Sequence, residues 1–288
     1  MFESGERSLK VLVALGAALL LESCAGPEPW NQNFPLAFDE AHEQAATMEA
    51  QPVPLSRPLV VLAGYLDPGF GSSWTAWTLE DLVGDTRTLP VSFFWCASFA
   101  GCREKLIDSV DAAFPSDDPC WTTEVDVVAL SMGGLVARDA AAPPTTPGRE
   151  RRLKIARLFT IGSPHRGARL AATPCFLALH RDMRKESAFV KRLAEAYTES
   201  DFELFPYARL GDGMVGAENT APEGESPLWV SNPAFSLAHL GSATDERILV
   251  DIALRLRGEE AYSRRDPSTG ERAPKQEITR SPESGDAF

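Results

Sequence analysis

Short apolar runs alternate with longer amphipathic stretches along most of this 288-residue chain. An apolar run rich in β-branched residues predicts a strand buried on both faces, whereas apolar positions three and four residues apart predict a helix. The predicted strands are residues 58–63, 91–95, 125–130, 153–161 and 227–231. The predicted helices are residues 73–83, 103–114, 134–142 and 244–256. This alternation predicts an α/β fold with a mostly parallel sheet and helices on both faces.

A sharp turn that carries Ser131 follows the central strand, 125–130. The alanine-rich helix after the turn, 134–142, is stopped by two prolines. A serine between a strand and a helix has a strained backbone, and its hydroxyl lies at the open end of the sheet. Free N–H groups at the start of the helix stabilise a developing oxyanion. Ser131 is therefore a candidate nucleophile, with a plain Ser-Gly turn as the alternative.

The turn residues A-L-S-M-G-G-L-V resemble the nucleophile elbow of α/β-hydrolases, and most closely that of lipases and esterases. The usual pattern is G-x-S-x-G, and Ala129 stands at the first glycine. The resemblance covers residues 58–258, and within the lipase and esterase group this region is similar to the GPI-inositol-deacylase-like lipases. It implies an α/β-hydrolase fold and a serine hydrolase that acts on carboxylic esters, without a metal or cofactor.

The same resemblance assigns an oxyanion hole to the loop after the first predicted strand. Lipases of this group carry a His-Gly pair there, and this chain has Ala63 and Gly64. The resemblance then implies that the backbone N–H groups of Tyr65 and Met132 are the two donors. A glycine is needed because the backbone must approach the substrate closely. A plain glycine-rich turn between strand and helix is the alternative.

The remaining catalytic residues follow later strands. Asp212, in the sequence R-L-G-D-G, is the candidate acid, although Asp-Gly is also a common turn signal. His239 follows the last predicted strand and is the candidate general base. The order Ser131, Asp212, His239 is the order found in α/β-hydrolases. The segment S-P-H-R-G, which contains His165, resembles a loop that lies beside the active site in lipases. We therefore assign His165 a structural or substrate-proximal role.

Residues 168–205 are predicted to be helical, and the resemblance places a hydrophobic cap over the active site in this segment. Ordinary packing of helices against the sheet is the alternative. The family resemblance also leaves open an inactive interaction module and an acyltransferase that uses the same acyl-enzyme. The expected substrates are a lipid or a small ester.

The N-terminus carries the features of an export signal. Residues 1–23 contain two basic residues and an apolar run that is too short to span a bilayer comfortably, and they end at L-E-S-C. This ending resembles a bacterial lipobox, in which Cys24 is lipidated and anchors the protein to a membrane of the cell envelope. A secretory signal for a secreted or periplasmic protein and a retained anchor are the alternatives. The net charge of −13 argues against a nucleic-acid partner.

The composition of both flanks predicts segments outside the catalytic domain. Residues 24–57 are predicted to be a tether with one short helix near 38–50, and residues 259–288 to be a disordered tail. Besides Cys24, the chain has an even number of cysteines, which predicts up to two disulfides in an oxidising compartment. Cys96 with Cys102 and Cys102 with Cys120 are the candidate pairs, and free thiols including Cys175 are the alternative.

Overall fold

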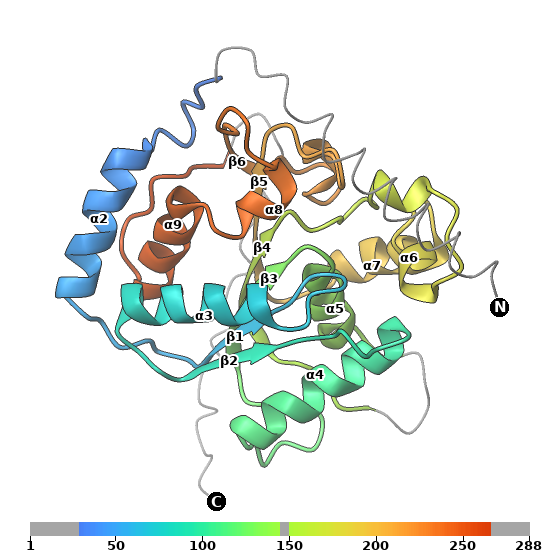
Figure 1. Ribbon diagram of the computed structural model, residues 1–288. Coiled ribbons are helices and arrows are strands. Elements are labelled where there is room, and N and C mark those ends of the chain that lie inside the picture. Colours follow the sequence, from blue (N-terminus) through green and yellow to red (C-terminus); the bar gives the residue numbers. More distant parts are fainter. Residues whose placement is uncertain (1–28, 145–149, 266–288) are drawn as a thin grey trace, which may run out of the picture.

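A six-stranded, fully parallel sheet forms the centre of the fold. The computed structural model describes residues 29–144 and 150–265 (Figure 1). Within these residues the strands lie in the order β2-β1-β3-β4-β5-β6, and each neighbouring pair is parallel. The strands are β1 (Leu59–Leu62), β2 (Thr88–Val91), β3 (Val125–Leu130), β4 (Ile155–Ile161), β5 (Glu203–Arg209) and β6 (Leu228–Val230). The α/β fold predicted from the alternation of apolar runs is confirmed.

Helices cover both faces of the sheet (Figure 1). One face carries α2 (Phe38–Ala50), α3 (Phe70–Val83) and α9 (Glu246–Arg257). The other face carries α4 (Phe99–Ala113), α5 (Met132–Ala141) and α7 (Ala188–Tyr197). The short helices are η2 (Leu170–Ala172), α6 (Ala178–Asp182), η3 (Ala217–Asn219) and α8 (Ala238–Ser242). In β1, Leu59 and Val61 join the core on the first face, while Val60 and Leu62 join the core on the second, because side chains alternate along a strand.

The aromatic run after β2 does not continue the strand. Residues 91–95 were the predicted strand, but β2 ends at Val91, where it pairs with Leu62. Phe94 and Trp95 lie beyond the sheet and are exposed. Residues 92–95 have the composition of a strand, but they form a loop at the carboxyl edge of the sheet.

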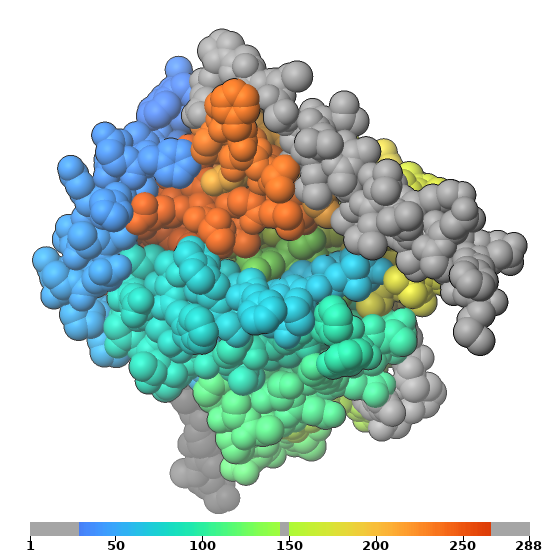
Figure 2. Space-filling view, in the orientation of Figure 1, coloured from blue at the N-terminus to red at the C-terminus, as the bar shows by residue number. Residues whose placement is uncertain are grey.

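Residues 29–57 belong to the domain, so the prediction of a free tether is wrong for this part of the chain. The predicted helix is confirmed as α2, which packs along α9 and α3 (Figure 2). Ala41, Ala45 and Met48 are buried, and their spacing of four and three residues forms one helical face. This narrow apolar stripe was not recognised in the sequence because polar residues surround it.

The domain also extends past residue 258. Ser263 is buried, and both its N–H and its hydroxyl donate to the carboxylate of Asp251, at 2.7 and 2.5 Å. The backbone N–H of Arg264 donates to the carbonyl of Asn33 at 2.7 Å. The chain therefore stays against the domain through Tyr262, Ser263 and Arg265, contrary to the prediction. The remainder of the predicted tail, the predicted signal segment 1–23 and Cys24 lie outside the described residues.

Only a part of the segment 168–205 lies where the resemblance placed a cap. Its last residues, from Glu203, belong to β5, and α7 buries Val190 and Leu193 in the core beside α5. Only the part around α6 lies near the candidate site, where the ring centroids of Tyr65 and His180 are 6.3 Å apart. Ordinary packing therefore accounts for α7.

The four cysteines in the described part of the chain are free, so the predicted disulfides are absent there. Cys102 is buried within the core beside Cys96, and burial together with the neighbouring thiol raises the pKa of Cys102. It packs as a small apolar side chain. Within the described residues, no helix combines the length and the apolar character needed to cross a bilayer.

Candidate active site

Ser131 lies at the carboxyl edge of the sheet, between β3 and α5, in a strained conformation. Its φ is 48° and its ψ is −119°, a region that residues other than glycine rarely occupy. Its N–H donates to the carbonyl of Ile161 at 2.8 Å, and its carbonyl accepts from Gly134 at 3.2 Å. These two bonds fix the backbone of the turn that carries the Ser131 hydroxyl.

Two glycines make this sharp turn possible. A methyl group on Gly133 would lie 2.8 Å from the carbonyl oxygen of Ala63, and one on Gly134 would lie 2.3 Å from Ser163 Oγ. Real side chains do not make such contacts, so α5 can approach β1 and the loop after β4 only with glycine here. This close approach brings the start of α5 against the loop that follows β1.

The structure brings Ser131, His239 and Asp212 together in one hydrogen-bonded chain. Ser131 Oγ lies 3.1 Å from His239 Nε2, and His239 Nδ1 lies 2.7 Å from Asp212 Oδ2. His239 and Asp212 are buried. His239 was expected on a loop after the last strand, but it lies within α8, the short helix that follows β6. Serine, histidine and carboxylate therefore have the spacing required to pass a proton from the hydroxyl to the imidazole.

The carboxylate of Asp212 is oriented by its own loop. Its second oxygen, Oδ1, accepts from the N–H groups of Met214 and Val215, both at 2.9 Å. The carbonyl of Asp212 accepts from Gly216 at 2.9 Å. The Asp-Gly turn signal and the role as acid are therefore compatible: the turn fixes one oxygen and leaves the other for His239.

The two expected oxyanion donors belong to the segments that adjoin Ser131. A methyl group on Gly64 would lie 3.3 Å from Ser131 Cβ, so the peptide leading to Tyr65 passes directly beside the serine. Met132 is the first residue of α5. Neither the Tyr65 nor the Met132 N–H donates to another backbone group in the described part of the chain. Asp67 shapes this loop by accepting from the N–H groups of Gly69, Gly71 and Ser72 at 2.8 to 3.2 Å.

Comparison with known proteins identifies the fold through structure alone, because no family model and no curated protein matches this sequence. The product of the gene lin2722 from Listeria innocua aligns with a TM-score of 0.51 at 12% identity, covering 72% of this chain and 96% of that one. Phospholipase PlaB from Legionella pneumophila aligns with a TM-score of 0.52 at 10% identity, covering 70% of this chain and 60% of that one. Lipase BlEst2 from Bacillus licheniformis has a TM-score of 0.46 at 15% identity, covering 72% and 94%.

This is an α/β-hydrolase fold. At such identities the two alignments with TM-scores above 0.5 establish the fold alone, and the activity has to be inferred from the site.

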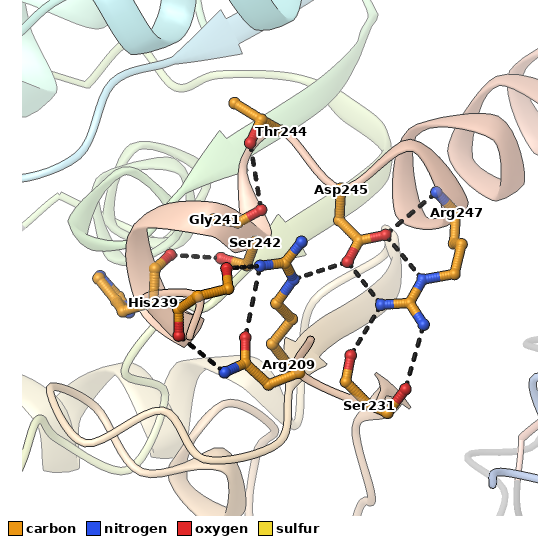
Figure 3. Close-up of polar contacts among 10 residues, drawn as sticks. Arg209, Ser231, His239, Gly241, Ser242, Thr244, Asp245 and Arg247 are labelled. Carbon is orange, nitrogen blue, oxygen red and sulfur yellow. Dashed lines mark hydrogen bonds and ion pairs between the residues drawn. The ribbon is translucent and has the colours of Figure 1, made fainter. Parts of the chain in front are cut away.

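A buried network of charges, not foreseen from the sequence, supports His239 in this α/β-hydrolase fold (Figure 3). Arg209, the last residue of β5, donates through Nε to Asp245 at 2.6 Å and through Nη1 to Ser236 Oγ at 2.9 Å. Arg247 binds the same carboxylate through Nε at 3.0 Å and Nη2 at 2.8 Å. Asp245 is fully buried. The only signal in the sequence was the pair Asp245 and Arg247 directly after an uncharged stretch.

Arg209 connects the loop of the acid to the helix of the base. It precedes Asp212 by three residues, and its guanidinium packs against Gly241, where a methyl group would lie 2.2 Å from Nη1. Ser236 and Asp245 lie on either side of α8. One side chain therefore fixes the position of α8 relative to β5, and with it the distance between His239 and Asp212.

We expect Arg209→Met to lower kcat about 10-fold with KM unchanged within about two-fold, because the imidazole loses its fixed position. Arg209→Lys restores one hydrogen bond and is expected to recover part of the loss. Both constants should be measured well below the unfolding midpoint of each variant. If the midpoint falls while kcat stays at the wild-type value, Arg209 stabilises the fold without positioning His239.

His165 is buried away from the chain of Ser131, His239 and Asp212. Arg138 Nη1 donates to His165 Nδ1 at 2.9 Å, and His165 Nε2 lies 2.9 Å from Thr160 Oγ1. Arginine has no acceptor, so His165 Nδ1 must accept and the ring is neutral with its proton on Nε2. Burial, and then the charge of Arg138, hold the pKa of His165 well below its usual range. These contacts agree with a structural role.

This neutral histidine predicts acid sensitivity. The pKa of His165 is lower in the folded than in the unfolded protein, so the unfolded chain binds the extra proton and stability falls as the pH drops below about 6.5. The slope for one group is at most about 1.4 kcal/mol per pH unit. The free energy of unfolding in urea should be measured at pH 7.5 and at pH 5.5. Between these two values we expect it to fall by about 1 kcal/mol more in wild type than in His165→Asn. Equal losses in both proteins would assign the acid sensitivity to other groups.

A cavity of about 630 Å³ lies elsewhere, between α4, α5 and α7, and none of the three candidate residues lines it. Its basic side chains are already engaged by the protein: Arg192 binds Asp139 at 2.6 Å, and Arg103 donates to the carbonyls of Asp139 and Ala142. The candidate site is therefore the group formed by Ser131, His239 and Asp212, and this cavity is not part of it.

Proposed function

We propose that this protein is an exported serine hydrolase that cleaves carboxylic esters through an acyl-enzyme on Ser131. The observation that carries the proposal is the unbroken chain from Ser131 Oγ to His239 Nε2 and from His239 Nδ1 to Asp212 Oδ2. The strained elbow supports the same reaction, as do the Tyr65 and Met132 N–H groups, which donate to no backbone carbonyl of the described residues. A complete arrangement of this kind disfavours an inactive interaction module.

The proposed reaction uses each group in turn. His239 Nε2 accepts the proton of Ser131 as Oγ attacks the ester carbonyl, and Asp212 stabilises the imidazolium that forms. The N–H groups of Tyr65 and Met132 bind the negative oxygen of the tetrahedral intermediate. His239 then donates its proton to the leaving alcohol, and the acyl group stays on Oγ. Water, deprotonated by His239, releases the acid and restores the serine.

Labelling with a fluorophosphonate probe tests this proposal, because the probe phosphonylates only an activated serine. We expect wild type to be labelled and Ser131→Ala to remain unlabelled. Hydrolysis of a series of esters with increasing acyl length would then define the substrate. Equal labelling of both proteins would place the reactive serine elsewhere.

We also propose that Cys24 is lipidated and anchors the protein to a membrane of a bacterial cell envelope. The support is the apolar run that ends at L-E-S-C. Cells that express wild type or Cys24→Ala should be fractionated, and we expect wild type in the membrane pellet and the variant in the soluble fraction. Two equally soluble proteins would exclude a lipid at this cysteine, and two membrane-bound proteins would favour an uncleaved anchor.

A further inference from the structure

Four aromatic side chains project into solvent around the edge of the sheet that carries Ser131, three from loops and one from the first residue of α3. They are Phe70, Trp95, Phe176 and Phe235, with exposed fractions of 83, 87, 87 and 90%. We name these four residues the apolar rim. Further exposed apolar side chains accompany them: Leu66, Phe94, Leu177, Leu237 and Leu240. Side chains of this size are rarely exposed together in a protein that presents only a polar surface to water.

The topology places the rim at the edge of the sheet where Ser131 lies. Because all strands are parallel, their carboxyl ends share one edge, and the rim residues follow β1, β2, β4 and β6. Cys175, the residue before Phe176, lies near Tyr65, whose pKa is raised by burial and by this thiol. The loop of Phe235 leads into α8 and His239. The rim therefore surrounds the approach to the serine.

The stretches of sequence that carry the four rim residues are also almost free of charge. Residues 92–102, 170–180 and 231–244 contain no Asp, Glu, Lys or Arg, although 24% of the whole chain is charged. In residues 63–79 the only charge is Asp67, whose carboxylate accepts three backbone N–H groups. Figure 2 shows the cyan segment and the orange segment that carry two of these stretches on the same side of the molecule.

We propose that the apolar rim inserts into a neutral lipid–water interface, so that Ser131 receives an ester presented by a lipid phase. This inference deepens the proposed function and rests on it for the role of Ser131. Phenylalanine and tryptophan partition into the interfacial layer of a bilayer. The stretches that carry the rim residues hold no Lys or Arg, and the chain has a net charge of −13, so attraction to anionic lipid is not expected to drive binding. A protein bound across the rim would block the approach of an ester to the serine.

The N-terminus of the described chain is consistent with this orientation. Asn31 donates to the carbonyl of Trp229 in β6 at 2.6 Å, directly before the loop that carries Phe235. Pro29 lies five positions after Cys24 in the sequence, and five extended residues reach at most roughly 18 Å. A lipid on Cys24, as proposed above, would thus hold the side of the molecule near Phe235 close to a membrane.

Binding to phosphatidylcholine vesicles tests the inference. Full-length protein carrying Cys24→Ala serves as the reference, so lipidation of that residue contributes nothing. Phe70, Trp95, Phe176 and Phe235 are all changed to Ser in one variant, and Trp77→Ser is the matched control. Trp77 is 63% exposed but lies about 10 Å further along α3 from Phe70. We expect vesicle partitioning to fall on the order of 100-fold in the rim variant and less than about three-fold in the control.

A conservative variant keeps the test independent of folding. Trp95→Phe should retain binding within about three-fold yet lose part of the fluorescence quenching that brominated phosphatidylcholine produces in the reference protein. Unchanged partitioning of a folded rim variant overturns the inference. So does binding that requires anionic lipid, or a dimer in sedimentation that the rim variant dissociates.

The two proposals fail separately. Vesicle binding does not need the hydroxyl of Ser131, so the Ser131→Ala protein should bind like the reference. If esters in water are hydrolysed but vesicles are not bound, the hydrolase stands without the lipid surface. If vesicles are bound through the rim but no ester is cleaved, the lipid-binding surface stands without the proposed reaction.

Discussion

Replacing Ser131 with alanine is expected to lower kcat for a short, water-soluble ester on the order of 10³-fold or more. The hydroxyl is the group that His239 Nε2 contacts at 3.1 Å, and no other side-chain oxygen lies within hydrogen-bonding distance of that nitrogen among the described residues. Without Oγ no acyl-enzyme forms. Only the weaker effect of Tyr65 and Met132 on attack by water would remain.

Ser163→Ala is the matched control for this prediction. Ser163 is a second serine beside α5, fully buried, and its Oγ has no hydrogen-bond partner within the described residues. Removing an unpaired buried hydroxyl is expected to leave stability unchanged or slightly increased. We therefore expect wild-type kcat for Ser163→Ala. Unchanged turnover in Ser131→Ala would end the proposed mechanism.

The sequence was most informative where a residue type has one geometric use. Ser131 follows the apolar run 125–130, which was predicted to be a buried strand and forms β3. It precedes Gly133 and Gly134, where the backbones of neighbouring segments come too close for a larger side chain. The contact between Asp212 and His239 followed from chain order and strand ends. The sequence did not predict that His239 lies in a helix, because A-H-L-G-S has too few residues to distinguish a loop from the short helix α8.

The remaining features depend on contacts that local patterns do not encode. The run around Phe94 has the composition of a strand, but pairing with β1 ends at Val91. The buried face of α2 is recognised only from its packing against α9 in the structure. Arg209 and Asp245 are 36 residues apart, and nothing in either neighbourhood pairs them. Pattern analysis thus identified the catalytic candidates, while the structure revealed the groups that hold them and the aromatic residues around them.

The second large effect is expected at His239. His239→Ala should lower kcat about 10³-fold or more, because no other base reaches Ser131 Oγ in the described structure. Asp212→Asn should cause a large but smaller loss, since an amide at Oδ2 no longer favours the tautomer with its proton on Nδ1. The kcat of each variant should be measured with the same soluble ester used for Ser131→Ala.

His165 is the internal control for this experiment. It is bound by Arg138 and Thr160, and its position beside a buried guanidinium disfavours the protonated ring that a general base must form. His165→Asn, which can still accept from Arg138, is therefore expected to reduce kcat only a few-fold, with its main effect on stability. A collapse of kcat in His165→Asn together with an active His239→Ala would reverse the assignment of the base and leave Ser131 as the nucleophile.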